Sequence, residues 1–187
     1  MRIIAGEFKG RRLRSPEDRR VRPTSDKVKE AVFSMLSPYL YDSTAADLFA
    51  GTGSLGLEAI SRGARRVYFS DRDRRSITLI RDNVAHCRAE DRSVILCSDF
   101  RDALRRFCEP IDIVFLDPPY DSGFLTDALK EISDGGILSD GAVVVAEHAA
   151  GESLPETFGK LTKVKSKKYG KIGITVYENA AEAEAEE

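Results

Sequence analysis

The sequence has 187 residues, of which 42% are hydrophobic and 32% are charged, and its formal net charge is −2. This length and composition predict one main soluble domain with a small appendage. No apolar run is long enough to span a bilayer and no secretory signal is recognisable, so we expect a cytoplasmic protein. The three cysteines, Cys87, Cys97 and Cys108, form no CxxC pair, and the sequence predicts neither a disulfide framework nor a metal site.

The net charge averages segments of opposite sign. Residues 9–22 contain seven Lys or Arg and two acids, and residues 160–171 contain six Lys and no acid. Such basic stripes are typical of surfaces that bind a nucleic-acid backbone, although either stripe alone could be an ordinary solvated face. The acidic tail, residues 179–187, is of low complexity and is predicted to be disordered.

The first predicted elements are two short strands, residues 2–6 and 11–15, which form an arginine-rich hairpin. The next segment, residues 22–36, contains a predicted amphipathic helix. Its N-cap is Ser25, and its apolar face is made by Val28, Val32, Met35, Leu36 and Tyr39. We expect residues 1–42 to form a small basic unit that leads into the main domain.

From residue 43 to residue 178, short apolar runs alternate with helical segments. The predicted strands cover residues 46–50, 66–70, 94–98, 112–116 and 142–147, and the predicted helices cover residues 54–63, 74–87, 100–108 and 124–133. This alternation predicts an α/β domain with a mostly parallel sheet and helices on both faces. Two further strand-like runs, joined through Tyr169, Gly170 and Lys171, predict a terminal hairpin with antiparallel strands.

The turn after the first strand of this domain carries Gly51-x-Gly53-x-x-Gly56. A glycine turn between a strand and a helix lets the backbone approach a nucleotide-like ligand, and Asp71, after the second strand, can accept hydrogen bonds from ribose hydroxyls. Dinucleotide oxidoreductases share this spacing, so it predicts a nucleoside cofactor without identifying it. Asp47 favours a ligand with an ammonium group, such as S-adenosylmethionine, because a pyrophosphate would meet like charge there.

Three further side chains have alternative interpretations. Asp99 can accept a hydrogen bond from an adenine amino group, with Phe100 in apolar contact, or it can cap the next helix. Asn83 lies either near the cofactor or on the exposed side of its helix. His148, beside Glu147, is expected to be satisfied by local hydrogen bonds.

The segment FLDPPYDSG, residues 115–123, follows the fourth strand at the same predicted sheet edge as the glycine turn. Its adjacent prolines end the strand, so a rigid corner is one interpretation. The other is recognition of a flat base that bears an amino group. If Asp117 and the Pro118 carbonyl accept the two N–H bonds of the amine, its lone pair can face an electrophilic methyl group while Tyr120 stacks on the base. Such a base must be unpaired or flipped out.

Taken together, RPTSDKVKEAVFSML, DLFAGTGSLGLEAISRGA, FSDRDRRS, DPPY and KKYGKIGITVYE resemble the RsmD family of small-subunit rRNA guanine-N2 methyltransferases, from Arg2 to about Glu178. The resemblance implies a Rossmann-like class I methyltransferase with a seven-stranded sheet whose last strand is antiparallel. It also implies methyl transfer from S-adenosylmethionine to N2 of one guanine in 16S rRNA, with S-adenosylhomocysteine as product. The implied substrate is the small ribosomal subunit or its assembly intermediate, and we expect the enzyme to be a monomer.

The resemblance also implies roles for individual residues. The cofactor is assigned to Asp47, Gly51, Gly53, Asp71, Asp99 and Phe100, and the target amine to Asp117, Pro118 and Tyr120. The substrate entrance is assigned to Arg22 and Thr24 of the RPT segment, and the hairpin arginines, Arg11, Arg12 and Arg14, are expected to bind RNA. The family more often has glutamate where this chain has Asp71, so Asp73 is kept as an alternative ribose ligand.

Two other function classes are compatible with the motifs. DPPY also occurs in methyltransferases that act on adenine N6 in DNA or on protein amides, but this chain has no large insert of the kind that sequence-specific DNA reading needs. The second alternative is a non-catalytic nucleotide-binding or RNA-binding module, or an NAD-dependent oxidoreductase.

Overall fold

The computed structural model describes residues 1–16, 26–119 and 123–180, so the predicted N-cap Ser25 lies outside the described residues. Its helices are α1 (Asp26–Leu36), α2 (Ser54–Ser61), α3 (Arg74–Cys87), α4 (Phe100–Leu104) and α5 (Phe124–Asp134). Its strands are β1 (Thr44–Asp47), β2 (Arg66–Asp71), β3 (Ser93–Cys97), β4 (Ile111–Leu116), β5 (Leu138–Ala149), β6 (Thr157–Phe158), β7 (Leu161–Tyr169) and β8 (Ile172–Asn179). No helix within the described residues is long and apolar enough to cross a membrane.

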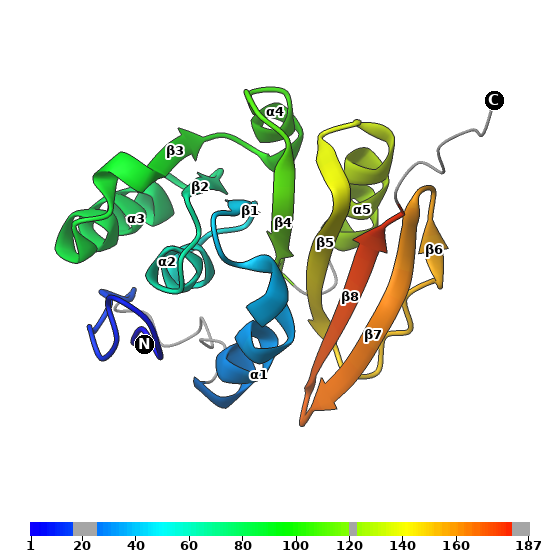
Figure 1. Ribbon diagram of the computed structural model, residues 1–187, viewed down its shortest axis with the longest axis horizontal. Coiled ribbons are helices and arrows are strands. Elements are labelled where there is room, and N and C mark those ends of the chain that lie inside the picture. Colours follow the sequence, from blue (N-terminus) through cyan, green and yellow to red (C-terminus); the bar gives the residue numbers. More distant parts are fainter. Residues whose placement is uncertain (17–25, 120–122, 181–187) are drawn as a thin grey trace.

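The strands form one mixed sheet in the order β3-β2-β1-β4-β5-β8-β7-β6 (Figure 1). The first five strands in this order are parallel, and β8, β7 and β6 each pair antiparallel with their neighbours. The predicted α/β class and the terminal hairpin are therefore confirmed. The described sheet has eight strands where seven were expected, because the two-residue strand β6 pairs with the beginning of β7.

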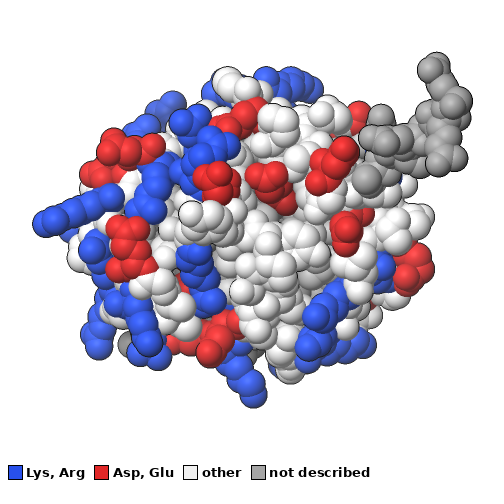
Figure 2. All heavy atoms as spheres, in the orientation of Figure 1, with Lys and Arg blue, Asp and Glu red and all other residues white. Residues whose placement is uncertain are grey.

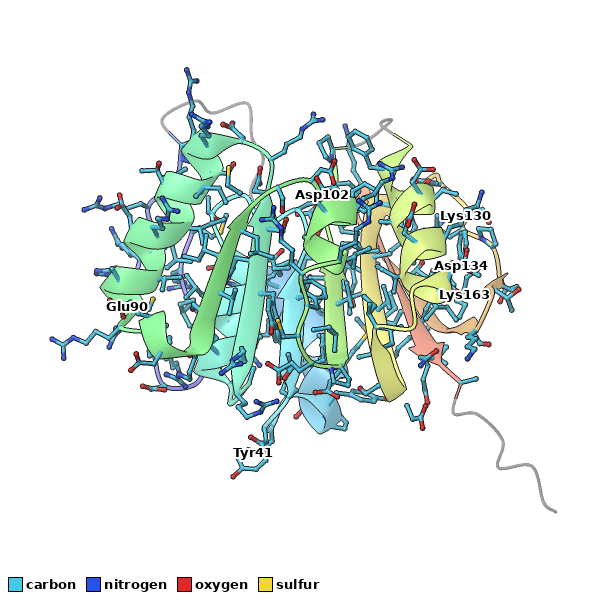
Figure 3. The ribbon with its side chains drawn as sticks, turned by 90° about the horizontal axis from the view of Figure 1, so that it is seen from above. Tyr41, Glu90, Asp102, Lys130, Asp134 and Lys163 are labelled. Carbon is cyan, nitrogen blue, oxygen red and sulfur yellow. The ribbon has the colours of Figure 1, made fainter. Side chains whose placement is uncertain are left out.

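Helices cover both faces of the sheet. Apolar side chains of α1, α2 and α3 belong to one buried cluster, and those of α4 and α5 belong to a second cluster on the opposite face. Figure 3, seen from above, shows α4, which carries Asp102, lying beside α5, which carries Lys130 and Asp134. This layering agrees with the alternation of buried strands and amphipathic helices in the sequence.

Residues 1–16 pack against the main domain without forming regular strands. Ile3 and Phe8 are buried in the same apolar cluster as Phe33 of α1 and Ile60 of α2. The predicted hairpin is reduced to one antiparallel bridge between Arg2 and Arg12. The boundary between the predicted units 1–42 and 43–178 stays a prediction.

The hairpin is irregular because its backbone bonds to α2. The Glu58 carboxylate accepts hydrogen bonds from Ile4 N (2.8 Å) and Ala5 N (3.0 Å), and the Ser61 hydroxyl accepts one from Phe8 N (2.9 Å). These N–H groups are therefore not available for pairing with a second strand.

A buried ionic cluster lies where the hairpin, α1 and α2 meet. Glu58 is fully buried and forms ion pairs with Lys29 Nζ (3.1 Å) and Arg62 Nε (2.8 Å). Lys29 also donates to the Arg2 carbonyl (2.6 Å) and to the Ser54 hydroxyl (3.1 Å). Burial lowers the pKa of Lys29, and the Glu58 carboxylate opposes this shift. The cluster ties residues 2–5 and α1 to α2.

Removal of the Glu58 charge should destabilise the whole domain. Glu58→Gln keeps the shape of the side chain but leaves Lys29 buried without its counter-charge, so we expect the free energy of unfolding to fall by about 3–5 kcal/mol. Urea unfolding measures this change. The control, Glu30→Gln on the exposed side of α1, should stay within about 0.5 kcal/mol of the wild type. A loss below about 1 kcal/mol for Glu58→Gln would contradict the role given to the cluster.

Candidate functional site

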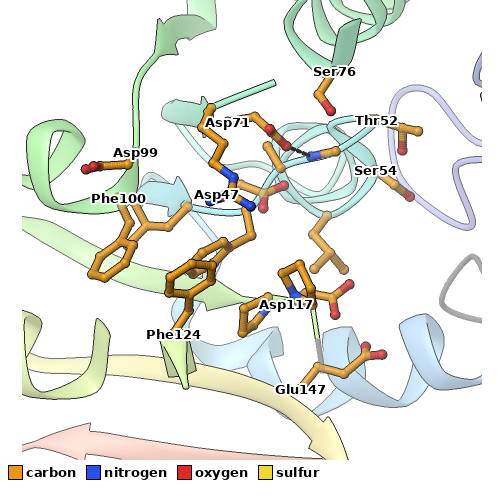
Figure 4. A pocket seen from close by; sticks show the side chains of 18 of the residues that line it. Asp47, Thr52, Ser54, Asp71, Ser76, Asp99, Phe100, Asp117, Phe124 and Glu147 are labelled. Atoms are coloured by element: carbon orange, nitrogen blue, oxygen red, sulfur yellow. Dashed lines mark hydrogen bonds between the residues drawn. The ribbon is translucent and has the colours of Figure 1, made fainter. Parts of the chain in front are cut away.

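A cavity of about 600 Å³ opens at the carboxyl ends of the parallel strands (Figure 4). It lies where the chain order of the sheet reverses between β1 and β4, which is the position where open α/β sheets bind ligands. Its wall includes residues from the ends of β1, β2, β3, β4 and β5, among them Asp47, Asp71, Ser98, Asp99, Asp117 and Glu147. The fold therefore brings most of the residues predicted for the cofactor and the target amine to one cavity, although Gly53 does not line it.

The glycine turn forms one side of the cavity. Gly51 and Gly53 have positive φ angles of 54° and 75°, a conformation that other residues adopt only with strain. Gly51 N donates to Asp71 Oδ2 (2.9 Å), the contact drawn as a dashed line in Figure 4. Gly56 N donates to Asp47 Oδ2 (3.0 Å). The two carboxylates thus hold the turn as well as facing the cavity.

The geometry distinguishes Asp71 from Asp73. Asp71 lines the cavity and is partly exposed, whereas Asp73 caps α3 by accepting a hydrogen bond from Arg75 N (2.9 Å). Of the two acids, only Asp71 is placed to bind a ligand in this cavity.

Asp47 has an unusual electrostatic environment. The residue is 2% exposed, and burial raises its pKa from 3.8 to about 7. The negative charge of Asp71 raises this pKa further, while the hydrogen bond from Gly56 N opposes the shift. A cation in the cavity would favour the ionised carboxylate, because opposite charges attract strongly where water is excluded.

Aromatic rings form the opposite side of the cavity. The Phe49 and Phe100 rings lie 5.5 Å apart, and the Phe124 ring lies 6.3 Å from Phe100. All three line the cavity, and the Arg72 guanidinium lies over Phe124 at 5.3 Å. This wall can pack against a flat aromatic group.

For Asp99 the helix-cap interpretation is confirmed, and its contact with an adenine stays a prediction. Its carboxylate accepts a hydrogen bond from Asp102 N (3.0 Å) and caps α4, and the same residue lines the cavity next to Phe100. The neighbouring Ser98 was not identified from the sequence. Its hydroxyl oxygen is buried at the cavity wall and has no protein hydrogen-bond partner among the described residues.

The DPPY segment begins at the cavity wall. Asp117, Pro118 and Pro119 line the cavity directly after β4. Tyr120, the predicted stacking residue, lies outside the described residues, and so do Arg22 and Thr24. Their assignments stay predictions.

Asn83 and His148 have structural roles. Asn83 is fully buried, and its amide bonds to both backbone groups of Arg14 and to the Thr52 carbonyl, which links the N-terminal segment to the glycine turn. His148 is buried and satisfied by the Ala149 carbonyl and the Thr175 hydroxyl, each at 2.9 Å, as expected from the sequence.

The hairpin arginines have protein contacts as well as exposure. Arg11 donates to the His86 carbonyl (3.0 Å), and Arg14 forms an ion pair with Asp82 (2.6 Å) while its side chain stays 71% exposed. Arg12 is exposed. The RNA-binding role of these three arginines stays a prediction.

Comparisons with known proteins give the family. The family described as "Conserved hypothetical protein 95" matches residues 1–178. Ribosomal RNA small subunit methyltransferase D of Escherichia coli (strain K12) is 33% identical over 186 residues, which is 100% of this chain and 93% of that protein. The chain belongs to the RsmD family. YlbH of Bacillus subtilis (strain 168), in the same family, is 37% identical over 180 residues, 95% of this chain and 98% of that one.

The fold of this family member agrees with a solved structure. The structure of yhhF from Escherichia coli superposes with a TM-score of 0.87 at 31% sequence identity, covering 97% of this chain and 99% of the other. The likeness extends over nearly the whole length of both chains, and therefore includes the cavity-forming strands and the terminal hairpin.

The raised pKa of Asp47 predicts a pH dependence of stability. Between about pH 4 and pH 7 the folded protein retains a proton on Asp47 that the unfolded chain has released. The unfolded state then binds fewer protons, so the free energy of unfolding falls as the pH rises, by up to about 1.4 kcal/mol per pH unit from this group. Urea unfolding of the ligand-free protein across this range should show a shallower decline for Asp47→Asn. The control Asp91→Asn, which removes an exposed carboxylate, should retain the wild-type slope of unfolding free energy against pH. Equal slopes for Asp47→Asn and the wild type would contradict the raised pKa of Asp47.

Proposed function

We propose that this chain transfers a methyl group from S-adenosylmethionine to the exocyclic N2 of one guanine in small-subunit 16S rRNA. Its family includes the ribosomal RNA small subunit methyltransferase D of Escherichia coli, which supports the reaction class. The target atom N2, the guanine base and the roles of individual residues are our proposal. The observation that supports them most is the convergence of Asp47, Asp71, Asp117 and an aromatic wall on one cavity.

The cavity residues fit S-adenosylmethionine. Asp47 and Asp71 suit a ligand that carries an ammonium group and ribose hydroxyls, since ionised carboxylates accept hydrogen bonds and attract positive charge. Phe100 and Asp99 suit an adenine, and the Ser98 hydroxyl offers a further buried polar group at the same wall. When bound, the cofactor supplies an electrophilic methyl group on a positively charged sulfur.

The chain's own contribution to the reaction is positioning. Asp117 and the Pro118 carbonyl accept the two N–H bonds of the target amine, so that its lone pair points into the cavity. The adjacent prolines fix these acceptors in advance, which lowers the cost of ordering them in the complex. As the new N–C bond forms, the amine loses a proton, and the Asp117 carboxylate is the nearest proposed acceptor for it.

A basic surface supports RNA as the substrate. Strand β7 is parallel to β5 in direction, so its carboxyl end lies at the same sheet edge as the cavity. The exposed side chains of Lys165, Lys167 and Lys168 lie along this half of β7. Figure 2 shows basic side chains gathered at the lower right, where Figure 1 places the end of β7. Phosphates of an RNA that presents a base to the cavity could contact them.

One experiment tests the proposed function directly. The protein is incubated with labelled S-adenosylmethionine and undermethylated small subunits, naked rRNA or DNA, and the labelled nucleoside is identified after digestion. N2-methylguanosine at one position of the rRNA is the expected product. Label in DNA, in protein or in a different nucleoside would overturn the proposal.

Asp117 should be needed for transfer and dispensable for cofactor binding. Asp117→Ala removes an acceptor for the amine, and we expect kcat to fall at least about 100-fold. Affinity for S-adenosylmethionine, measured by calorimetry, should change by less than about threefold. Asp134→Ala, an exposed position at the end of α5 (Figure 3), serves as the control. Retained turnover in Asp117→Ala would refute the assigned role.

The lysines of β7 should contribute to the salt dependence of binding. Lys165→Glu combined with Lys167→Glu should weaken binding to small subunits, and the slope of log K against log salt should become shallower by about one unit per lost phosphate contact. Lys130→Glu on α5 tests for a general effect of charge and should leave the slope unchanged. An unchanged slope in the β7 variant would show that these lysines do not contact the RNA.

A further inference from the structure

Glu147 is a cavity residue that none of the sequence motifs includes. It lies near the end of β5, it is 7% exposed, and it lines the same cavity as Asp117. Because β4 and β5 pair in parallel with Leu116 opposite Ala146, Asp117 and Glu147 are the next residues along two neighbouring strands. Figure 4 shows both labelled carboxylates on the same side of the cavity.

Neighbouring strands are about 4.8 Å apart, so residues in register on them can contact one flat group at two adjacent positions. Guanine presents two adjacent donors on its Watson–Crick edge, the N2 amine and the N1–H group. Adenine presents an amine beside N1, which has no hydrogen and is itself an acceptor. An ionised carboxylate only accepts hydrogen bonds, so it attracts the guanine N1–H and repels the adenine N1.

We propose that Glu147 accepts the N1–H hydrogen bond of the target guanine while Asp117 holds its N2 amine, and that Glu147 thereby selects guanine. This inference rests on the proposed function, because it assigns a residue to the base in that same site. A buried carboxylate that accepts a hydrogen bond from its substrate rejects an analogue that has no hydrogen at that position. The complex with the analogue would bury the carboxylate against another acceptor, the N1 atom of the base. The fold thus provides base selection on the strand next to the one that carries DPPY.

The test uses 2-aminopurine, which keeps the N2 amine of guanine but has no hydrogen on N1. Small subunits are reconstituted with ligated rRNA that carries either guanine or 2-aminopurine at the position methylated by the wild-type protein. We expect wild-type kcat/KM to be at least about 30-fold higher for guanine. In Glu147→Gln the amide can accept from guanine N1–H or donate to the N1 of 2-aminopurine, so this preference should shrink at least about tenfold.

Controls separate base selection from folding. Asp140→Asn removes an exposed carboxylate near the other end of β5 and should keep the wild-type preference. Glu147→Ala is the second variant, since it neither accepts from nor repels N1 and should also lose the preference. A Glu147 that only supports the fold would lower both rates equally and leave their ratio unchanged.

Each other result overturns the inference in a distinct way. An unchanged ratio in both Glu147 variants would refute it while the proposed function stands. A raised KM for S-adenosylmethionine with an unchanged ratio would show that Glu147 holds the cofactor instead. Failure of the wild-type protein to methylate guanine in the subunits would refute the proposed function itself, and the wild-type arm alone reveals that failure.

Discussion

The buried contact of Glu58 with Lys29 and Arg62 is the interaction on which the N-terminal half of the molecule depends. Charged groups without water need counter-charges and hydrogen bonds, and this cluster takes them from residues 2–5, α1 and α2 together. Because α2 begins at the glycine turn, the same cluster fixes the hairpin next to the cavity. Lys29 donates a hydrogen bond to Ser54, which lines the cavity, and to the carbonyl of Arg2, the residue after Met1 of the cavity wall.

The cavity combines several acids with an aromatic wall, and this combination restricts the ligands it can accept. Asp47, Asp71 and Asp99 each accept a hydrogen bond from a nearby backbone N–H, so their orientations do not depend on a ligand. A cationic ligand with a flat aromatic group matches such a preformed site, whereas a pyrophosphate would meet several negative charges. The parallel strands produce this convergence, because their carboxyl ends all meet at one edge.

Much of this arrangement could be predicted from sequence where local patterns determine the structure. The alternation of apolar runs and helical segments, the glycine turn and the Tyr169-Gly170-Lys171 turn each depend on neighbouring residues, and the sheet and terminal hairpin are confirmed. The predicted strands 2–6 and 11–15 are reduced to one bridge, since Glu58, more than fifty residues further along the chain, accepts the N–H groups of Ile4 and Ala5 in the first of them. Glu147 was missed for a similar reason, because only strand register brings it beside Asp117.

The predicted first sheet strand, 46–50, instead covers Thr44–Asp47, because the chain leaves the ladder early to make the glycine turn.

The terminal hairpin extends the sheet beyond β5, so that β7 lies along its border. In the described residues β8 covers β5, and β6 pairs with β7 only at Leu161 and Thr162, so the rest of β7 forms an edge. An uncovered edge offers backbone groups to any second chain, and lysines on it discourage such pairing through repulsion and the cost of desolvation. The charges proposed to meet RNA therefore also disfavour pairing of this edge with a second chain. Neutralising them would leave the edge of β7 without this protection.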